Sequence, residues 1–162
     1  MSDDATKFES SALALAGRYG IACELRRHAR SGATTEGASD ALGLDPRQII
    51  KFLILRRKSG DRTCVGVVIR GDERLDLKKV QALAGINGLS FADPEFVLGL
   101  TGFDVGGVPP VALGLCDVKF VSRSLFDVPL VVGGGGHDHC GMALAPAALL
   151  NIPGAQVADI GG

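Results

Sequence analysis

The chain has 162 residues, a formal net charge of −1 and a mean hydropathy of +0.27, and 46% of its residues are hydrophobic. This length and composition predict one domain, spanning residues 1–162, that buries a single core, and they exclude a disordered chain. Membrane-spanning helices are excluded as well, because Gly or a charged residue interrupts every long apolar run.

The positive charges are concentrated in the first half of the chain. Residues 1–79 hold 15 of the 17 Lys and Arg and 11 of the 18 Asp and Glu, which gives +4, whereas residues 80–162 carry −5. Three basic clusters stand out: Arg26-Arg27-His28-Arg30, Lys51 with Arg56-Arg57-Lys58, and Lys78-Lys79. If they meet on one face they can hold a phosphate backbone; otherwise they are solvated ends of helices and strands.

Two features favour a cytoplasmic location. The N-terminus, Met1 to Asp4, lacks the basic region of a signal peptide. The cysteines are widely spaced with no CxxC pair, which favours reduced thiols over a disulfide framework or a zinc ribbon. These cysteines are Cys23, Cys64, Cys116 and Cys140.

Periodicity and capping signals predict the elements of the first half. Thr34 and Asp76 are placed to cap helices, and Asp45-Pro46 opens a turn. In chain order the predicted elements are a helix over 5–19, a strand over 22–29, a helix over 34–43, strands over 49–57 and 63–70, and a helix over 76–84.

The second half is richer in Gly, and its predicted elements are shorter. In chain order they are a helix from Asp93-Pro94 to about Gly99, strands over 117–122, 128–132 and 142–144, a short helix over 146–150 and a last strand over 157–160. Strands and helices alternate irregularly, so the predicted fold class is mixed α/β and not a regular series of βαβ units.

The segment 101–110 reads Thr-Gly-Phe-Asp-Val-Gly-Gly-Val-Pro-Pro. It has too much Gly and Pro for the interior of a helix or strand, and too many apolar residues for a linker. It is therefore either a structural turn or a rigid loop whose bare N–H groups bind an oxyanion, a carboxylate or a carbonyl oxygen.

Lys51 is the one charged residue in the apolar run 49–55. On a strand its neighbours alternate between two faces that are both apolar, so we expect a central strand. The lysine then either extends to solvent along its aliphatic stem, or it is a cation in a cleft that binds phosphate or polarises a carbonyl.

Residues 133–140 read Gly-Gly-Gly-Gly-His-Asp-His-Cys. Glycines at the end of an apolar strand indicate close approach of the backbone to a ligand. They lack the GxGxxG order of a dinucleotide site, and the chain has no GxxxxGK[ST]. His137, His139 and Cys140 could bind zinc, but only His28 remains as a further histidine, so we predict no metal and no cofactor.

Together these features resemble the YbaK family, also known as the insertion (editing) domain of bacterial prolyl-tRNA synthetase. The resemblance rests on Lys51 at the start of an apolar strand, the loop 101–110 and the late glycine-rich strand end, in this order. Thr34 with Leu42-Gly43, and the segment 71–79, add to it. It covers approximately residues 26–160.

The resemblance implies a mixed sheet of six or seven strands, curled toward a barrel and flanked by helices. It also implies a free-standing enzyme that hydrolyses mischarged aminoacyl-tRNA in trans. An aminoacyl ester is already activated, so water can attack it while loop N–H groups stabilise the oxyanion and a lysine neutralises negative charge. The vicinal ribose hydroxyl, or the thiol of a cysteinyl substrate, can assist proton transfer.

The family pattern also implies the residues of the site. The implied catalytic residues are Lys51, Gly106, Gly107 and Pro110. The implied substrate-binding residues are Thr34, at the terminal adenosine, and Phe52, Phe103, Val108, Gly134, Gly135, Gly136 and His137. From the charge clusters we assign Arg26, Arg27, Arg56, Arg57, Lys78 and Lys79 to RNA binding.

Two departures from the family leave the substrate open. Phe52 stands where members often have Ser or Thr, and His137 lies where the family varies. The expected substrate is the acceptor end of a tRNA with a small amino acid such as Ala, Cys, Ser or Thr, with tRNA(Pro) a leading candidate. A synthetase is a further potential partner, and no membrane or DNA partner is expected.

Two other functions stay open on the sequence. The same pocket could hold an aminoacyl, nucleotide or RNA end without turnover. The second alternative is a metal hydrolase built on His137, His139 and Cys140.

Overall fold

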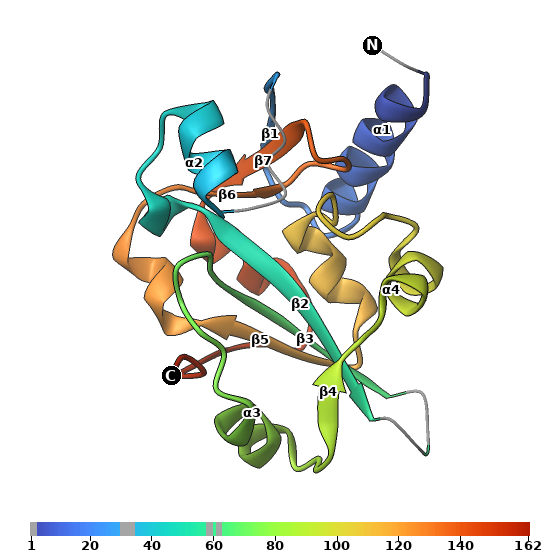
Figure 1. Cartoon of the computed structure of the whole chain (residues 1–162), viewed down its shortest axis with the longest axis vertical. Coiled ribbons are helices and arrows are strands. Elements are labelled where there is room, and N and C mark those ends of the chain that lie inside the picture. Colours follow the sequence, from blue (N-terminus) through green and yellow to red (C-terminus); the bar gives the residue numbers. More distant parts are fainter. Residues whose placement is uncertain (1–2, 30–34, 58–59, 61–62) are drawn as a thin grey trace.

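The computed structural model describes residues 3–29, 35–57, 60 and 63–162, and their strands form two sheets (Figure 1). The smaller sheet has the order β1 (Glu24–Arg27), β7 (Cys140–Leu144), β6 (Val131–Gly134). The larger sheet has the order β4 (Leu89–Phe91), β2 (Ile50–Arg57), β3 (Cys64–Arg70), β5 (Val118–Ser122), β8 (Ala155–Ala158).

Helices flank both sheets. The smaller sheet lies beside α1 and α2, and α3 lies at the far end of the larger sheet (Figure 1). The α-helices are α1 (Asp3–Arg18), α2 (Thr35–Leu42), α3 (Leu77–Ala84) and α4 (Pro94–Thr101). The 3₁₀ helices are η1 (Pro46–Gln48), η2 (Pro110–Leu115), η3 (Arg123–Asp127) and η4 (Pro146–Asn151). None of the helices described is both long and apolar enough to cross a membrane.

The helix starts follow local side-chain chemistry. The Asp76 carboxylate accepts hydrogen bonds from the backbone N–H groups of Lys78 and Lys79, and the Asp93 carboxylate accepts one from Phe96. Both helices therefore begin where the sequence predicted, because these carboxylates satisfy N–H groups that have no partner inside the helix.

The mixed α/β class is confirmed, but a single sheet curled toward a barrel is not. β1, β6 and β7 pair with one another as a separate sheet, and the pairings between described strands close neither sheet. Sequence analysis also missed β4, which has only three residues, and it ended the predicted strand 128–132 before Gly133 and Gly134, which belong to β6.

β2 connects the two sheets. It pairs with β3 along nearly its whole length but with β4 only over Leu55–Arg57, and Ile49 just before it forms a parallel bridge to Val132 of β6. The strand predicted to be central, β2, has neighbours on both sides only at its C-terminal end. The middle strand of the sheet is β3, which is buried from Cys64 to Ile69. Between Ile50 and Ile54 one edge of β2 has no partner strand among the described residues.

The two largest hydrophobic clusters lie on opposite faces of the larger sheet. The first packs α1 against η2 and the smaller sheet, and its fully buried members include Ala12, Val111, Leu113, Val131 and Met142. The second packs α3 against the larger sheet, and its fully buried members include Leu55, Val67, Ile69 and Val80.

The loop 102–110 packs directly against the end of β6, backbone to backbone. The N–H of Gly136 donates to the C=O of Gly107 at 2.9 Å. A Cβ atom added to Gly134 would lie 2.5 Å from the carbonyl oxygen of Val108, closer than a real Cβ atom approaches. These glycines are therefore required by the close approach of the two chain segments.

We predict that Gly134→Ala lowers the free energy of unfolding by about 1–3 kcal/mol, because the added methyl group must displace the Val108 backbone. Gly99→Ala is the matched control, since Gly99 lies in α4 and a Cβ there meets nothing within 4 Å. The free energy of unfolding of this control should rise by about 0.5–1 kcal/mol, because Ala has a higher helix propensity than Gly. Urea denaturation measures both, and equal effects would contradict the predicted role of Gly134.

Candidate active site

A cavity of about 360 Å³ lies along the open edge of β2. The loop 102–110 and the facing strands β6 and β7 enclose it. Its lining includes Lys51, Phe52, Gly106, Val108, Gly133 and Gly134, which the sequence singled out from three distant segments. Lys51 is the sole Lys, Arg, Asp or Glu among the described residues that line it.

The open edge presents peptide groups to this cavity. The N–H of Ala92 donates to the C=O of Ile54 at 2.9 Å, whereas the C=O of Ile49 accepts from Gly71 on the β3 side at 2.7 Å. Because the edges alternate along a strand, the N–H and C=O of Phe52 point to the same edge as those of Ile54. This edge can hydrogen-bond the amino and carbonyl groups of an aminoacyl ligand.

Lys51 is half-buried at the rim of the cavity. Its ammonium group has no hydrogen bond and no ion pair with any residue that the structure describes. A cation without a counter-ion beside apolar walls attracts an anion, or the negative charge that develops in a transition state.

The loop 102–110 offers two backbone donors. Gly106 has φ +97°, a conformation that favours glycine. The N–H groups of Gly106 and Val108 have no partner within the described ranges, whereas the N–H of Gly107 donates to the C=O of Asp104 at 3.0 Å. If this loop stabilises an oxyanion, Gly106 and Val108 are the donors, and Gly107 holds the turn.

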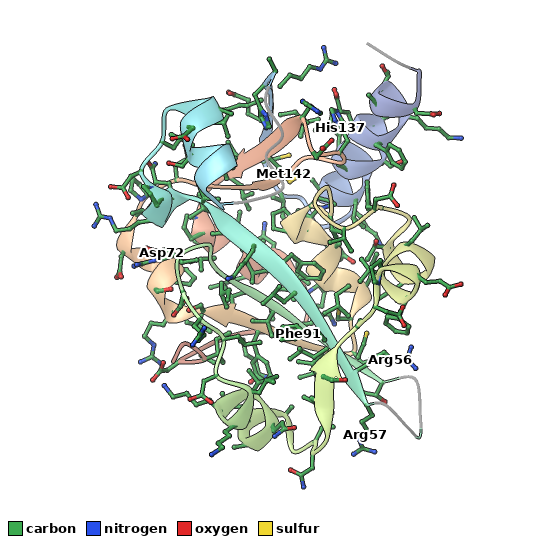
Figure 2. All side chains as sticks on the ribbon, viewed as in Figure 1. Arg56, Arg57, Asp72, Phe91, His137 and Met142 are labelled. Atoms are coloured by element: carbon green, nitrogen blue, oxygen red, sulfur yellow. The ribbon has the colours of Figure 1, made fainter. Side chains whose placement is uncertain are left out.

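Several predicted site residues do not line the cavity. Phe103 is buried in the first core, with its ring centroid 6.2 Å from that of Phe8. Pro110 begins η2, Gly135 and Gly136 make backbone hydrogen bonds, and His137 turns toward α1 (Figure 2). Thr34 lies outside the described residues, so its contact with a terminal adenosine stays a prediction.

A buried carboxylate on α1 holds the loop that follows β6. The Arg27 guanidinium donates to Glu9 Oε1 through Nη2 at 2.7 Å and through Nε at 2.9 Å. His137 Nε2 lies 2.7 Å from Glu9 Oε2. The His139 N–H donates to His137 Nδ1, so in the neutral imidazole the hydrogen is on Nε2 and is donated to Glu9.

This network changes the acidity of its carboxyl group. The hydrogen bond from Arg27 lowers the pKa of Glu9 below its usual value, and His137 adds to this effect although burial opposes it. The network connects α1, β1 and the β6–β7 loop. Sequence analysis missed it, because no local motif relates Glu9 to Arg27 or to His137 on a distant loop.

The same corner contains the metal-ligand candidates. The ligand atoms of Glu9, His137 and Cys140 lie within 4.8 Å of one another, so α1 supplies a third ligand that the sequence did not reveal. Burial raises the pKa of the Cys140 thiol to about 11, so it is protonated at neutral pH. Both Glu9 oxygens already have partners. These contacts favour a structural ion network, and the absence of a metal stays a prediction.

Residues 29–152 match the family model of the aminoacyl-tRNA editing domain. The chain belongs to this family. The resemblance to YbaK-type editing domains is thereby confirmed.

Similar proteins agree with this assignment. EbsC of Enterococcus faecalis, named as a candidate Cys-tRNA(Pro)/Cys-tRNA(Cys) deacylase, is 25% identical over 128 residues, which cover 78% of this chain and 76% of EbsC. A proline–tRNA ligase of Thermotoga maritima is 36% identical over 109 residues, which cover 65% of this chain and 18% of the ligase. A solved structure described as a candidate trans-editing enzyme for prolyl-tRNA synthetase has a TM-score of 0.82 and 30% identity, covering 100% of this chain and 99% of that one.

The basic residues assigned to RNA binding lie outside the cavity lining of this editing domain. Arg26 pairs with Glu24, and Lys79 binds Asp159 and the C=O of Gly161. Arg56 stacks on the Phe96 ring at 4.2 Å, and Figure 2 shows Arg56 and Arg57 at the end of β2 farthest from α2. Lys78 is exposed on α3. RNA binding by all of these residues stays a prediction.

Sequence analysis missed part of the editing-domain cavity. The additional lining residues include His28, Ala38, Leu42, Phe91, Val105 and Cys140. Phe91 and Val105 are 57% and 61% exposed, so both present apolar surface at the mouth of the cavity. The alternation of side chains along strands could not assign Phe91 or Val105 to the cavity, because β4 is short and Val105 lies in a loop.

We predict that Glu9→Gln lowers the free energy of unfolding at pH 7 by about 2 kcal/mol, because the carboxylate accepts charge-assisted hydrogen bonds in a buried position. The pKa of Glu9 is lowered in the folded state, so its contribution is present above the unfolded value of about 4.3 and is lost as pH falls through the lower folded value. The difference between wild type and variant should therefore shrink below pH ~4.3.

Glu24→Gln is the matched control for this experiment. Glu24 pairs with Arg26 on the same strand as Arg27, but its side chain is 69% exposed. Loss of this exposed ion pair should lower the free energy of unfolding by about 0.5 kcal/mol or less. Thermal denaturation from pH 3 to pH 7 gives both comparisons, and a Glu9→Gln effect that is constant with pH would contradict the network's assignment.

Proposed function

We propose that this editing domain is a trans-acting deacylase that hydrolyses the ester of mischarged aminoacyl-tRNA. One observation carries the proposal: an unpaired cation, Lys51, shares a cavity with two free loop N–H groups and an open strand edge. At about 360 Å³ the cavity is at the small end of ligand sites, which suits an aminoacyl group. The names of the relatives support this function.

The proposed reaction needs only water and the substrate. The open edge at Phe52 binds the α-amino group, and the ester carbonyl lies between Lys51 and the Gly106 loop. Water attacks the carbonyl carbon, and the N–H groups of Gly106 and Val108 with the Lys51 ammonium stabilise the oxyanion. The ester C–O bond then breaks, and the ribose oxygen receives the proton that water loses, giving free amino acid and tRNA.

The proton transfer does not depend on a carboxylate of the protein. No Asp or Glu occurs among the described lining residues, so we assign this transfer to the vicinal ribose hydroxyl or to a bound water. The apolar walls strengthen the interactions of Lys51, because little water screens them.

The lining favours alanyl and cysteinyl groups among the small amino acids. Apart from Lys51 and His28, the side chains around the cavity are apolar or are those of glycine and cysteine. A seryl or threonyl hydroxyl would lose hydrogen bonds to water here without equivalent replacements. tRNA(Pro) is the leading tRNA candidate, because relatives are named for prolyl-tRNA synthetase and for Cys-tRNA(Pro).

We predict that Lys51→Ala reduces deacylation of alanyl- or cysteinyl-tRNA(Pro) by about 10²-fold or more, as for the loss of one oxyanion contact. Lys51→Met, which keeps the aliphatic stem without the charge, should lose about as much. Lys7→Ala, at an exposed lysine of α1, is the control and should stay fully active. Melting temperatures should show that the variants remain folded.

Single-turnover assays give these rates. Wild-type protein that binds mischarged tRNA without hydrolysing it would instead favour the non-catalytic binding function. Full activity in both Lys51 variants would contradict the role assigned to this lysine.

We predict that charge reversal at Arg56 and Arg57 weakens tRNA binding but leaves hydrolysis of an aminoacyl-adenosine nearly unchanged, because neither residue lines the cavity. Wild-type affinity should fall steeply with salt, since phosphate contacts release counter-ions. Filter binding measures the tRNA affinity across salt concentrations, and single-turnover assays measure the hydrolysis rates on both substrates. Equal slowing on both substrates, or an affinity that is flat across salt, would place the RNA surface elsewhere.

A further inference from the structure

We propose that Phe91 is a stacking platform for the terminal adenine of the tRNA, and that a depression beside it holds the terminal nucleoside. This inference rests on the proposed function, because it places the nucleotide that carries the ester. Phe91 ends β4, next to β2 (Figure 2).

The depression adjoins the aminoacyl cavity. It has a volume of about 560 Å³, and its lining includes Lys51, Leu53, Asp72, Arg74 and Phe91. Lys51, Leu53 and Phe91 also line the first cavity. The two spaces therefore share one rim, and a substrate can occupy both with its reacting bond beside Lys51.

The register of the strands sets the distance between the two spaces. Phe91 lies opposite Leu55 on the neighbouring strand, so both side chains are on the sheet face that also carries Lys51 and Leu53. Lys51 is four residues before Leu55, about 13 Å along the strand. A ribose fits within this separation of the two backbone positions, so the ester can lie at Lys51 while the base lies at Phe91.

Phe91 has the properties of a binding side chain. Phe91 is 57% exposed, although the hydrogen bond between Ala92 and Ile54 holds the end of β4 in place. A rigid, exposed aromatic ring stacks on a base without reading its hydrogen-bonding edges. This suits an enzyme whose substrates share their terminal nucleotide and differ in the amino acid.

Polar groups are also available around the base and the ribose. The hydrogen bond from Arg70 holds the pKa of Asp72 below its usual value, so its exposed carboxylate is ionised and can accept hydrogen bonds from hydroxyl or amino groups. Arg74 lies on the same depression and has no ion pair within the described part of the chain.

The test compares two small esters that differ only in the base: 3′-O-alanyl-adenosine and the alanyl ester of methyl riboside. Phe91→Ala should raise KM for the adenosine ester about 10-fold, the loss expected for one stacked base, with kcat within about twofold. Phe91→Tyr should behave as wild type. On the base-free ester, Phe91→Ala should lose much less activity than it loses on the adenosine ester, and Phe91→Tyr should again behave as wild type.

Phe126→Ala is the matched control, because Phe126 is an exposed phenylalanine on η3 that lines neither space. It should leave both esters unaffected. Unchanged kinetics in Phe91→Ala, or an equal loss on both esters, would overturn the proposal, since the latter result would mean that Phe91 only shapes the aminoacyl cavity.

Binding of free adenosine separates this inference from the proposed function. Wild-type protein should bind adenosine, and Phe91→Ala should bind it about 10-fold more weakly. If wild-type protein hydrolyses neither the esters nor mischarged tRNA, the deacylase function fails, whereas the adenosine titration still decides whether Phe91 stacks on the base. Equal adenosine affinity in both proteins would overturn the stacking assignment.

Discussion

The backbone contact between two glycine-rich segments is the constraint on which the cavity depends. The Gly107 carbonyl accepts the N–H of Gly136, and Gly134 lies against the Val108 carbonyl without room for a Cβ atom. A side chain at either contact would push the loop 102–110 away from β6. The loop would then lose the position that directs it toward Lys51 and the edge of β2.

A missing stretch of sheet creates the space that the loop covers. β4 pairs with only the last three residues of β2, so the first part of that strand keeps an open edge. Open edges invite pairing with other chains, and proteins usually cover them. Here the loop 102–110, α2 and the smaller sheet cover the edge without filling it, which leaves peptide groups available to a ligand.

Lys51 differs from the charged residues that form ion pairs within the protein. Arg27 and His137 share the Glu9 carboxylate, and Arg70 binds Asp72. Lys51 has no such partner among the described residues, although it lines a largely apolar cavity. The Glu9 network holds the β6–β7 loop, so α1 stabilises a segment that follows one wall of the cavity, although no residue of α1 is among the described lining residues.

The sequence by itself determined the elements with strong local signals and the principal residues of the cavity. The carboxylates of Asp76 and Asp93 marked helix starts, and the lone charge of Lys51 and the glycines at 106 and 134 marked positions that the cavity brings together. Only the tertiary structure decided which strands share a sheet, since that choice depends on pairing between distant segments. It also decided that His137 turns to Glu9 and that Phe91 reaches the mouth of the cavity, because no local pattern encodes contacts with remote residues.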